Sequence, residues 1–394
     1  MVPSPRAPSS GPAAPARRAL LGALLAAALF PGCGPDRPRP PPPAVGELVP
    51  VATSEGFLWT GVTVSDTGRV FLCYPRWVGA HRYSVVELAA DGALMPYPDA
   101  DSNRWKPGTL MPRVADAWVC VQSVRCDGDV LYVLDAGNPS FGGIVGQAAK
   151  LSVVDLKTSK VRRSYPFHRS AVDRMSYLND VRIDHGHGVA YVTDSGLGAL
   201  VVVDLATGVQ RRLLADHPST KAEDDVVPTV QGRRLLSGRA DGDPVPLRVH
   251  ADGLTLDPTG TWLYWQALTA RTLWRAPTAV LADAKATAAQ VEAAVERVGT
   301  TVVADGLEVG TDGTIFLTAL EEDAIVARRP NGTLERLVRD PRLAWPDTLA
   351  ITDDGTLYVT TSQLHRTPLM AGVTGLPRTP YALFRTGTRA PPPR

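Results

Sequence analysis

The chain has 394 residues, of which 44% are hydrophobic and 21% charged, and its 41 basic and 40 acidic side chains leave a formal net charge of +1. So balanced a charge excludes the basic footprint of a nucleic-acid-binding protein, and the hydrophobic content is ample for a large core. The four cysteines form no CxxC pair and no Cys/His cluster, which argues against structural zinc.

Residues 1–33 have the pattern of an export signal. A basic segment precedes an apolar run at residues 19–30, and Gly32 stands directly before Cys33, as in a bacterial lipobox. The run is too short for a good membrane span, so we expect any membrane attachment to use a lipid on Cys33. Simple secretion and an uncleaved anchor are the alternatives. The Pro-rich residues 34–46 would be a stiff spacer that holds the folded part off the bacterial cell envelope.

From residue 47 onwards the chain carries an internal repeat of β-hairpins. Each copy opens with a polar and a small residue, continues as a strand, and is followed by a turn and a second strand such as LYV. The copies are TGVTV (60–64), QSVR (122–125), NDVRI (179–183), DGLTL (252–256), DGLEV (305–309) and DTLAI (347–351). Repeats with several strands each are typical of propeller blades. We therefore predict an all-β fold, a six-bladed β-propeller over residues 47–388, followed by a Pro-rich tail at residues 389–394.

The last repeat lacks a fourth strand, whereas residues 47–53 resemble a strand without a blade of its own. We expect this N-terminal strand to complete the last blade and remove an exposed edge. An Ala- and Glu-rich stretch at residues 277–298 predicts one helix. Long insertions between blades reach the face where each repeat opens, and they occupy about residues 96–121, 165–178, 215–251 and 339–346. Loops gathered on a rigid scaffold indicate that this face carries the binding site.

The polar residues that open the repeats are the candidate ligand-binding residues. If all of them lie at the mouth of the central channel, they form one ring of Thr60, Gln122, Asn179, Asp252, Asp305 and Asp347, with Asp180 beside Asn179. Three carboxylates that converge in a narrow space repel one another, so the ring favours a positively charged guest. For any single member, a role in capping the turn before its strand is the alternative.

Two kinds of guest fit this ring. Ca²⁺ accepts oxygen ligands in irregular geometry, and its ligands would be Asn179, Asp252, Asp305 and Asp347. An organic ammonium would use a carboxylate for its charge and an aromatic wall for its body, and the candidates for that wall are Trp59, Trp105, Trp118 and Trp345. The sequence identifies no catalytic residue, although His217 and His250 could approach the ring as proton shuttles.

Several stretches resemble the family of major royal jelly and insect yellow proteins, which includes bacterial relatives labelled as related to dopachrome tautomerase. They are FLCYPRW (71–77), LYVLDAG (131–137), AYVTDSG (190–196), ADG (304–306) and WPDT (345–348), and they span most of residues 50–365. The resemblance implies a secreted six-bladed propeller whose central cavity, in some members, binds biogenic amines or acts on dopachrome. Other members are nutritive or structural, so the resemblance implies no single reaction.

A more distant similarity is to the gluconolactonase and senescence-marker group, which holds a divalent metal in the channel of the same architecture. Asn179 matches the Asn-bearing blade of that group, and Asp252 or Asp305 matches its Asp-Gly blade. The glutamate of its first blade, however, would fall at Thr60. The match to the metal site is therefore incomplete.

Three functional predictions follow. The first is an exported, monomeric propeller that binds a small cationic or aromatic ligand in its channel. The second is an enzyme, either a metal-dependent lactonase-like hydrolase or an isomerase that works by proton transfer. The third is an interaction scaffold of the cell envelope.

Three smaller expectations concern residues outside the ring. Cys73 should be a small buried hydrophobe, and Cys120 and Cys126 could pair in an oxidising compartment, although three thiols allow three pairings. Asp135 and Asp194 follow second strands and should form turns. The Arg76 and Trp77 side chains are expected to lock a loop rather than touch a ligand.

Overall fold

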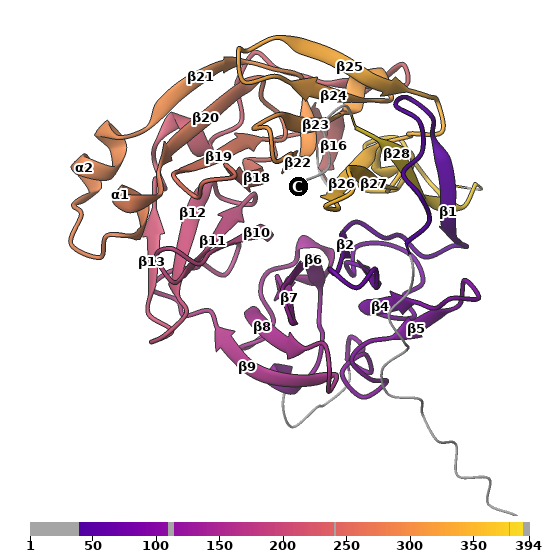
Figure 1. Ribbon diagram of the computed structural model, residues 1–394, viewed down its shortest axis with the longest axis horizontal. Helices are drawn as coiled ribbons and strands as arrows, with labels where there is room; N and C mark the ends of the chain where they lie inside the picture. Colours follow the sequence, from indigo (N-terminus) through magenta and orange to yellow (C-terminus); the bar gives the residue numbers. More distant parts are fainter. Residues whose placement is uncertain (1–38, 109–113, 240–241, 378, 389–394) are drawn as a thin grey trace, which may run out of the picture.

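The structure is a computed structural model that describes residues 39–108, 114–239, 242–377 and 379–388. Within these residues six four-stranded antiparallel sheets are arranged in a ring, with the strand that opens each repeat nearest the centre (Figure 1). The predicted six-bladed β-propeller is thereby confirmed. The predicted signal at residues 1–33, with Cys33, and the predicted tail at residues 389–394 lie outside the described residues. In the described part of the chain, no helix has the length and apolar character needed to cross a bilayer.

Blades one to five each consist of four strands in sequence order. Blade one contains β2 (Val62–Val64), β3 (Val70–Cys73), β4 (Val85–Leu88) and β5 (Leu94–Pro96). Blade two contains β6 (Val121–Asp127), β7 (Val130–Asp135), β8 (Lys150–Asp155) and β9 (Lys160–Pro166). Blade three contains β10 (Leu178–Asp184), β11 (Val189–Asp194), β12 (Ala199–Asp204) and β13 (Gln210–Leu213).

The second half of the ring has the same plan. Blade four contains β18 (Ala251–Leu256), β19 (Trp262–Ala267), β20 (Thr272–Pro277) and β21 (Glu296–Thr300). Blade five contains β22 (Ala304–Val309), β23 (Ile315–Ala319), β24 (Ala324–Arg328) and β25 (Leu334–Arg339). The insertion between blades three and four adds two small hairpins, β14 (Thr229–Val230) with β15 (Arg233–Arg234) and β16 (Leu236–Arg239) with β17 (Gly242–Pro246).

Blade six joins the two ends of the described chain. Its inner strands β26 (Pro346–Ile351), β27 (Thr356–Thr361) and β28 (Tyr381–Gly387) are followed at the rim by β1 (Val49–Ser54), which pairs antiparallel with β28. The predicted closure by the N-terminal strand is therefore consistent with the structure. Pairing with β1 leaves β28 without a free edge, which protects the ring from pairing with other chains.

The predicted single helix at residues 277–298 is wrong. The segment forms two short helices, α1 (Thr278–Ala282) and α2 (Ala288–Ala293), and then the rim strand β21. Asp283 is extended and ends α1, and Thr287 starts α2 with a reciprocal capping box to Gln290. The extended residue Asp283 and the cap at Thr287 divide the helix, and pairing with β20 makes its last residues part of the rim strand β21.

The opening of each repeat is a β-bulge in blades two to six. The pairing register between first and second strands shifts across Gln122, across Asn179 and Asp180, and across the Asp-Gly or Asp-Thr pairs at 252–253, 305–306 and 347–348. Bulges turn a side chain out of the regular sheet and are common beside functional sites. The second residue of the opening pair is small because the next blade packs closely against it. A Cβ on Gly253 would lie 2.5 Å from the carbonyl oxygen of Asp305 in that blade.

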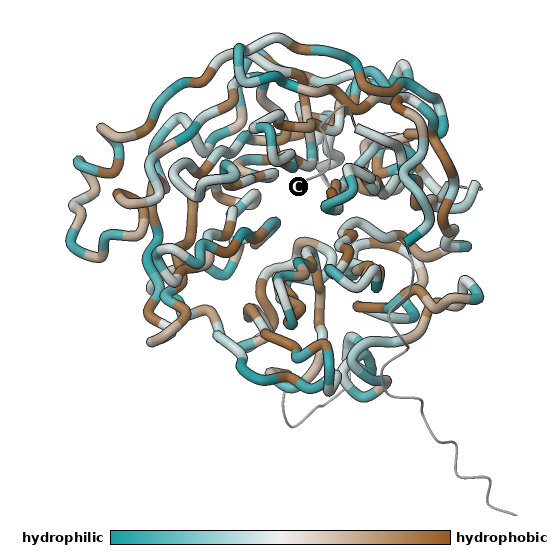
Figure 2. Tube along the Cα trace, in the orientation of Figure 1, coloured by the Kyte–Doolittle hydropathy of each residue, from teal (hydrophilic) through white to brown (hydrophobic). Residues whose placement is uncertain are grey.

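Apolar residues lie along the strands, whereas turns at the rim are largely hydrophilic (Figure 2). Cys73 is buried, as expected, and Cys73, Cys120 and Cys126 are all unpaired. The possible Cys120–Cys126 pair is absent because Cys120 directly precedes β6 and Cys126 lies near its end, so the extended strand holds the two residues apart.

Two aspartates that follow second strands are buried anchors as well as turn formers. Asp135 accepts a turn hydrogen bond from the Gly137 amide and two more from the Val119 and Cys120 amides, and it pairs with Lys150. Asp194 accepts from the Tyr177 and Gly196 amides and from the Arg212 side chain in the same way. Each carboxylate therefore ties the loop that enters its blade to the loop that leaves the second strand.

Candidate functional site

A cavity of about 460 Å³ lies at the mouth of the channel, on the face where the repeats open. Its lining includes four of the predicted ligand-binding residues, namely Gln122, Asn179, Asp252 and Asp305. The β16–β17 hairpin contributes Ser237 and Gly238 to one wall, and the amide of Ala371 holds this hairpin by donating to the Leu236 carbonyl at 2.8 Å. The predicted face and the core of the predicted ring therefore coincide with a real cavity.

The other predicted residues do not line this cavity. Thr60 is fully buried, and its hydroxyl donates to the Gln122 carbonyl oxygen at 3.3 Å, so it serves the contact between blades one and two. Asp180 accepts from the Ser123 hydroxyl at 2.8 Å and from Arg182 at 2.9 Å. Asp347 is buried and accepts from the hydroxyl of Thr348 at 3.1 Å.

The three ring aspartates form one buried acidic cluster. Burial, and then the charge of Asp305, raise the pKa of Asp252 well above its usual range, and the same two causes raise that of Asp347. Burial also raises the pKa of Asp305 to about 6, against hydrogen bonds from the Trp345 indole and from Asp252 that favour its ionised form. Asp305, whose pKa is raised only to about 6, is therefore the member of the cluster that ionises most readily.

An aromatic wall faces the acids, but its composition differs from the prediction. Trp77 stacks on Phe141 with ring centroids 5.4 Å apart, and Phe141 lies 4.8 Å from Tyr177. All three line the cavity together with Trp345, the one predicted tryptophan that does so. Arg76 and Trp77 were expected to lock a loop. Arg76 donates to the carbonyls of Trp105 and Val119, and the Trp77 indole donates to the Tyr177 hydroxyl while its ring also lines the cavity.

Three tryptophans predicted for that wall are part of the core instead. Trp59 is fully buried, and its ring centroid lies 6.0 Å from that of Tyr74. Trp105 lies under the Arg76 guanidinium, and the Trp118 indole donates to the Tyr97 carbonyl. Phe141 and Tyr177 were missed because they stand in loops without periodicity. Tyr177 lies in the insertion between blades two and three, which was the available signal for it, whereas Phe141 lies in the β7–β8 loop inside blade two, which carried none.

The backbone is strained at the residues that build the wall. Phe141 has φ of +56° and Trp345 has φ of +57°, a left-handed conformation that bulky residues rarely adopt. The Trp345 indole donates to Asp305 Oδ2 at 2.7 Å and its ring stacks on His365 with centroids 6.1 Å apart. Strain of this kind persists only where surrounding contacts enforce it, and it gathers at binding sites.

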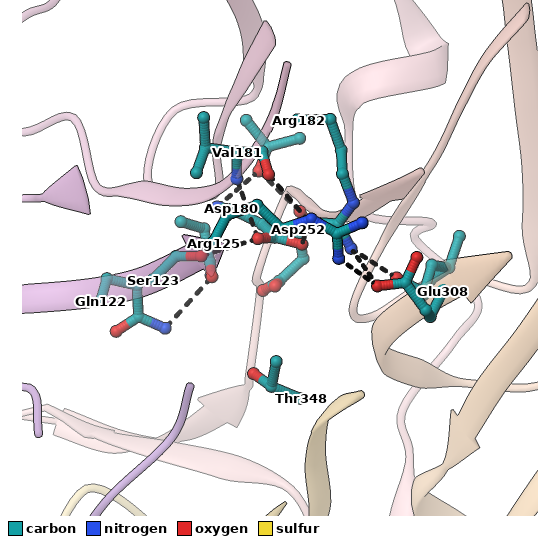
Figure 3. Close-up of polar contacts among 12 residues, drawn as sticks. Gln122, Ser123, Arg125, Asp180, Val181, Arg182, Asp252, Glu308 and Thr348 are labelled. Carbon is teal, nitrogen blue, oxygen red and sulfur yellow. Dashed lines mark hydrogen bonds and ion pairs between the residues drawn. The ribbon is translucent and has the colours of Figure 1, made fainter. Parts of the chain in front are cut away.

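Below the acids, a network of alternating charges occupies the channel (Figure 3). Asp180 pairs with Arg182, the Arg182 guanidinium lies 3.7 Å from Glu308, and Glu308 also pairs with Arg125. Burial opposes ionisation of Glu308, but the two arginines outweigh it and hold its pKa below the usual value. Arg125, Arg182 and Glu308 line a second cavity of about 620 Å³ at the opposite end of the channel. The charges of the network cancel, so the acidic cluster receives no net compensation from it.

The predicted Ca²⁺ ligands do not form a ready cage. Within the described residues, no group of three or more His, Cys, Asp or Glu side chains is arranged to hold a metal ion. One oxygen of Asp305 is occupied by the Trp345 indole, and Asp347 lies outside the cavity lining. The residues present therefore do not fit a divalent metal as they stand, and Ca²⁺ at Asn179, Asp252, Asp305 and Asp347 stays a prediction.

Neither predicted histidine reaches the cavity. His250 Nδ1 accepts from the Ala222 amide, and burial lowers its pKa. His217 caps the turn at Ser219 and packs edge-on against Trp274. Proton transfer in this cavity would therefore depend on its carboxyl groups.

Comparison with known proteins agrees with this architecture. The family model described as "Major royal jelly protein" matches residues 119–371, and no curated protein sequence matches the chain. A putative gluconolactonase superposes with a TM-score of 0.53 at 14% identity, over 89% of this chain and 94% of its own. A luciferin-regenerating enzyme gives 0.51 at 10% identity, over 88% and 99%. The virginiamycin B lyase of Staphylococcus aureus gives 0.47 at 11% identity, over 86% and 99%.

Proposed function

The chain belongs to the major royal jelly protein family, and from this premise we propose that it binds a small cationic ligand with an aromatic body in the cavity at the channel mouth. The observation that carries the proposal is that a buried acidic cluster and an aromatic wall line one cavity. Arg248, which also lines this cavity, is paired with the exposed Asp224. The acidic part of the cavity lining consists of Asp252 and Asp305. The aromatic wall includes Trp77, Phe141 and Tyr177.

The electrostatics favour a cation. Because Asp305 is buried and its pKa is raised to about 6, its ionised form is costly in the empty cavity. An ammonium group placed beside it would lower that cost and gain a charge-assisted hydrogen bond. Aromatic faces add attraction for the same cation and bury the apolar body of the ligand.

The experiment compares phenethylamine with 2-phenylethanol, which has the same body and no charge, by calorimetric titration at pH 7.5. We expect the amine to bind about tenfold more tightly or better, since one close charge contributes about 1.4 kcal/mol. Asp305→Asn should remove most of that preference. Asp257→Asn, a carboxylate of the second cavity, is the matched control and should preserve it. Equal affinities for the two probes, or a preference that survives Asp305→Asn, would refute the proposal.

A second candidate is an isomerase of the dopachrome type, supported by the protonation of the acidic pair. The pKa values of Asp252 and Asp305 are pushed apart, which is the arrangement of a general acid beside a general base. Asp305 would remove one proton from the substrate and Asp252 would return one, so no oxidant is needed. Loss of dopachrome absorbance measured with wild type and Asp252→Asn tests this; equal rates would exclude it. The metal-dependent lactonase hypothesis has no comparable support, because the described residues form no preformed group of ligands for its metal ion.

Export with a lipid on Cys33 is part of the proposal and rests on the sequence of residues 1–33 alone. A monomeric state is likewise an expectation. Neither affects the chemistry of the cavity.

A further inference from the structure

Residues 39–41, at the N-terminal end of the described chain, are held against the propeller by two arginines. Arg39 Nη2 donates to the carbonyl oxygen of Asp66, in the turn between β2 and β3. Arg385 Nη1 donates to the carbonyl oxygens of Pro40 at 3.2 Å and of Pro41 at 3.1 Å. The segment is therefore tied to blades one and six before β1 begins.

These contacts lie on the face opposite the cavity. The first strand of each blade runs away from the residue that opens the repeat and ends at the turn to the second strand. Asp66 lies in such a turn, and Val45 forms a bridge with Gly387, which is opposite Thr356 at the beginning of β27. The cavity lies at the other end of the first strands, where the residues that open the repeats line it. A first strand of seven residues, such as β10, spans about 20 Å, so the two faces are at least that far apart.

The length of chain before Arg39 limits how the propeller can sit on a membrane. Arg39 follows Cys33 by six residues, and a fully extended chain of six residues spans about 20 Å. A tether of this length reaches a bilayer that lies next to the face carrying Arg39. It is too short to pass around the rim and across the thickness of the propeller to the cavity mouth.

The face that carries Arg39 is acidic at its surface, and we call it the turn face because the six turns between first and second strands form it. These turns contain Asp66, Asp129, Asp257, Asp312, Asp353 and Asp354. Their one Lys or Arg residue is Arg69, which is buried and paired with Glu87. Anionic headgroups repel such a surface within a Debye length of about 10 Å at 0.1 M salt. The turn face can thus lie near a bilayer only because the tether holds it there.

We infer that, in a protein anchored at residue 33, the turn face lies toward the bilayer and the cavity opens away from it. The partner of the turn face is a lipid bilayer, and the tether makes the attachment. The cavity then receives its ligand from the aqueous phase and not from the membrane. This inference rests on the proposed anchor at Cys33 and does not depend on the chemistry of the cavity.

Energy transfer from a dye on the protein to rhodamine-labelled lipid measures this orientation. A hexahistidine tag replaces residues 1–32, and phosphatidylcholine vesicles with nickel-chelating lipid bind it, so the anchor is present whether or not residue 33 carries a lipid. Cys33→Ser removes the thiol next to the tag. The dye is attached either to Thr311→Cys, on the turn face, or to Met175→Cys, at the cavity mouth, and both positions are exposed.

The natural thiols do not interfere with this labelling. Burial raises the pKa values of Cys73, Cys120 and Cys126 to about 12, so these side chains remain unreactive thiols at pH 7. The chain without an introduced cysteine shows whether any dye attaches to them.

We expect energy transfer from residue 311 to be about twofold or more as efficient as from residue 175, because residue 311 lies about 20 Å nearer the bilayer. Arg39→Ala combined with Arg385→Ala frees the segment from the turn face and should reduce this difference. Arg163→Ala is the matched control, since Arg163 donates to the carbonyls of Leu205 and Ala206 and not to the segment. It should leave the difference unchanged.

Equal transfer from the two positions, or stronger transfer from residue 175, overturns the inference. A difference that survives the double substitution, or that Arg163→Ala also abolishes, overturns it as well, because the contacts of Arg39 and Arg385 would then not set the orientation. The proposed function fails separately, when the affinity for phenethylamine does not depend on Asp305.

Discussion

Replacing Asp305 by Asn tests the electrostatics of the acidic cluster in the ligand-free protein. Asn has the same shape and retains an oxygen for the Trp345 indole, so the change removes the ionisable group and the charge by which it raises the pKa values of Asp252 and Asp347. The pKa of Asp305 rises from 3.8 in the unfolded chain to about 6 in the fold. A raised pKa means that protonated Asp305 favours the folded state below pH 3.8, and that this contribution is lost as the pH rises through 6.

The magnitude follows from the size of the shift. The full titration corresponds to about 3 kcal/mol, and about 2 kcal/mol of it falls between pH 4.5 and 7.5. Asn does not titrate. The free energy of unfolding of Asp305→Asn relative to wild type should therefore increase by about 2 kcal/mol between these two pH values, which for a domain of this size is a Tm difference of about 3 °C.

Urea denaturation of both proteins at pH 4.5 and 7.5, in EDTA, measures this change directly. Asp91→Asn, an exposed aspartate in the turn between β4 and β5, controls for the general effect of losing one negative charge. A difference between wild type and Asp305→Asn that is the same at both pH values would refute the reasoning. It would mean that the Asp305 carboxylate is compensated in the fold, as by a bound cation.

The remaining predictions concern the scaffold. Gly253→Ala places a Cβ 2.5 Å from the Asp305 carbonyl oxygen and should lower the free energy of unfolding, measured by urea denaturation, by about 3 kcal/mol. Gly375→Ala, with open space around it, should change that free energy little. Equal effects of the two substitutions would contradict the bulge-packing argument. Lys150→Met leaves the buried Asp135 carboxylate unpaired and should lower the free energy of unfolding by about 3 to 5 kcal/mol. Adding Asp135→Asn should recover part of that loss, and no recovery would show that the pair is not the cause.

Much of the candidate site was accessible from the repeat. The polar opening position predicted Gln122, Asn179, Asp252 and Asp305, and all four line the cavity. The same rule failed at Thr60, which is turned into the contact with blade two, and at Asp347, which is covered. Equivalent positions in a repeat share a backbone path, but the side chain they carry and the loop above them decide whether they meet solvent.

The aromatic wall shows the limit of periodicity most clearly. Trp77, Phe141 and Tyr177 come from three separate loops, and their rings meet only because the closed ring brings those loops together. Four tryptophans were predicted for the wall from their nearness to the decorated face, and only Trp345 lines it.

The sequence by itself determined the six hairpin repeats, their closure by the N-terminal strand, and the acidic character of the channel mouth. These depend on alternation and turn chemistry, which act over a few residues. Only the tertiary structure decided which ring members line the cavity and which aromatic rings line it with them. The physical reason is that such features depend on contacts between segments distant in sequence, and local propensities do not specify those contacts.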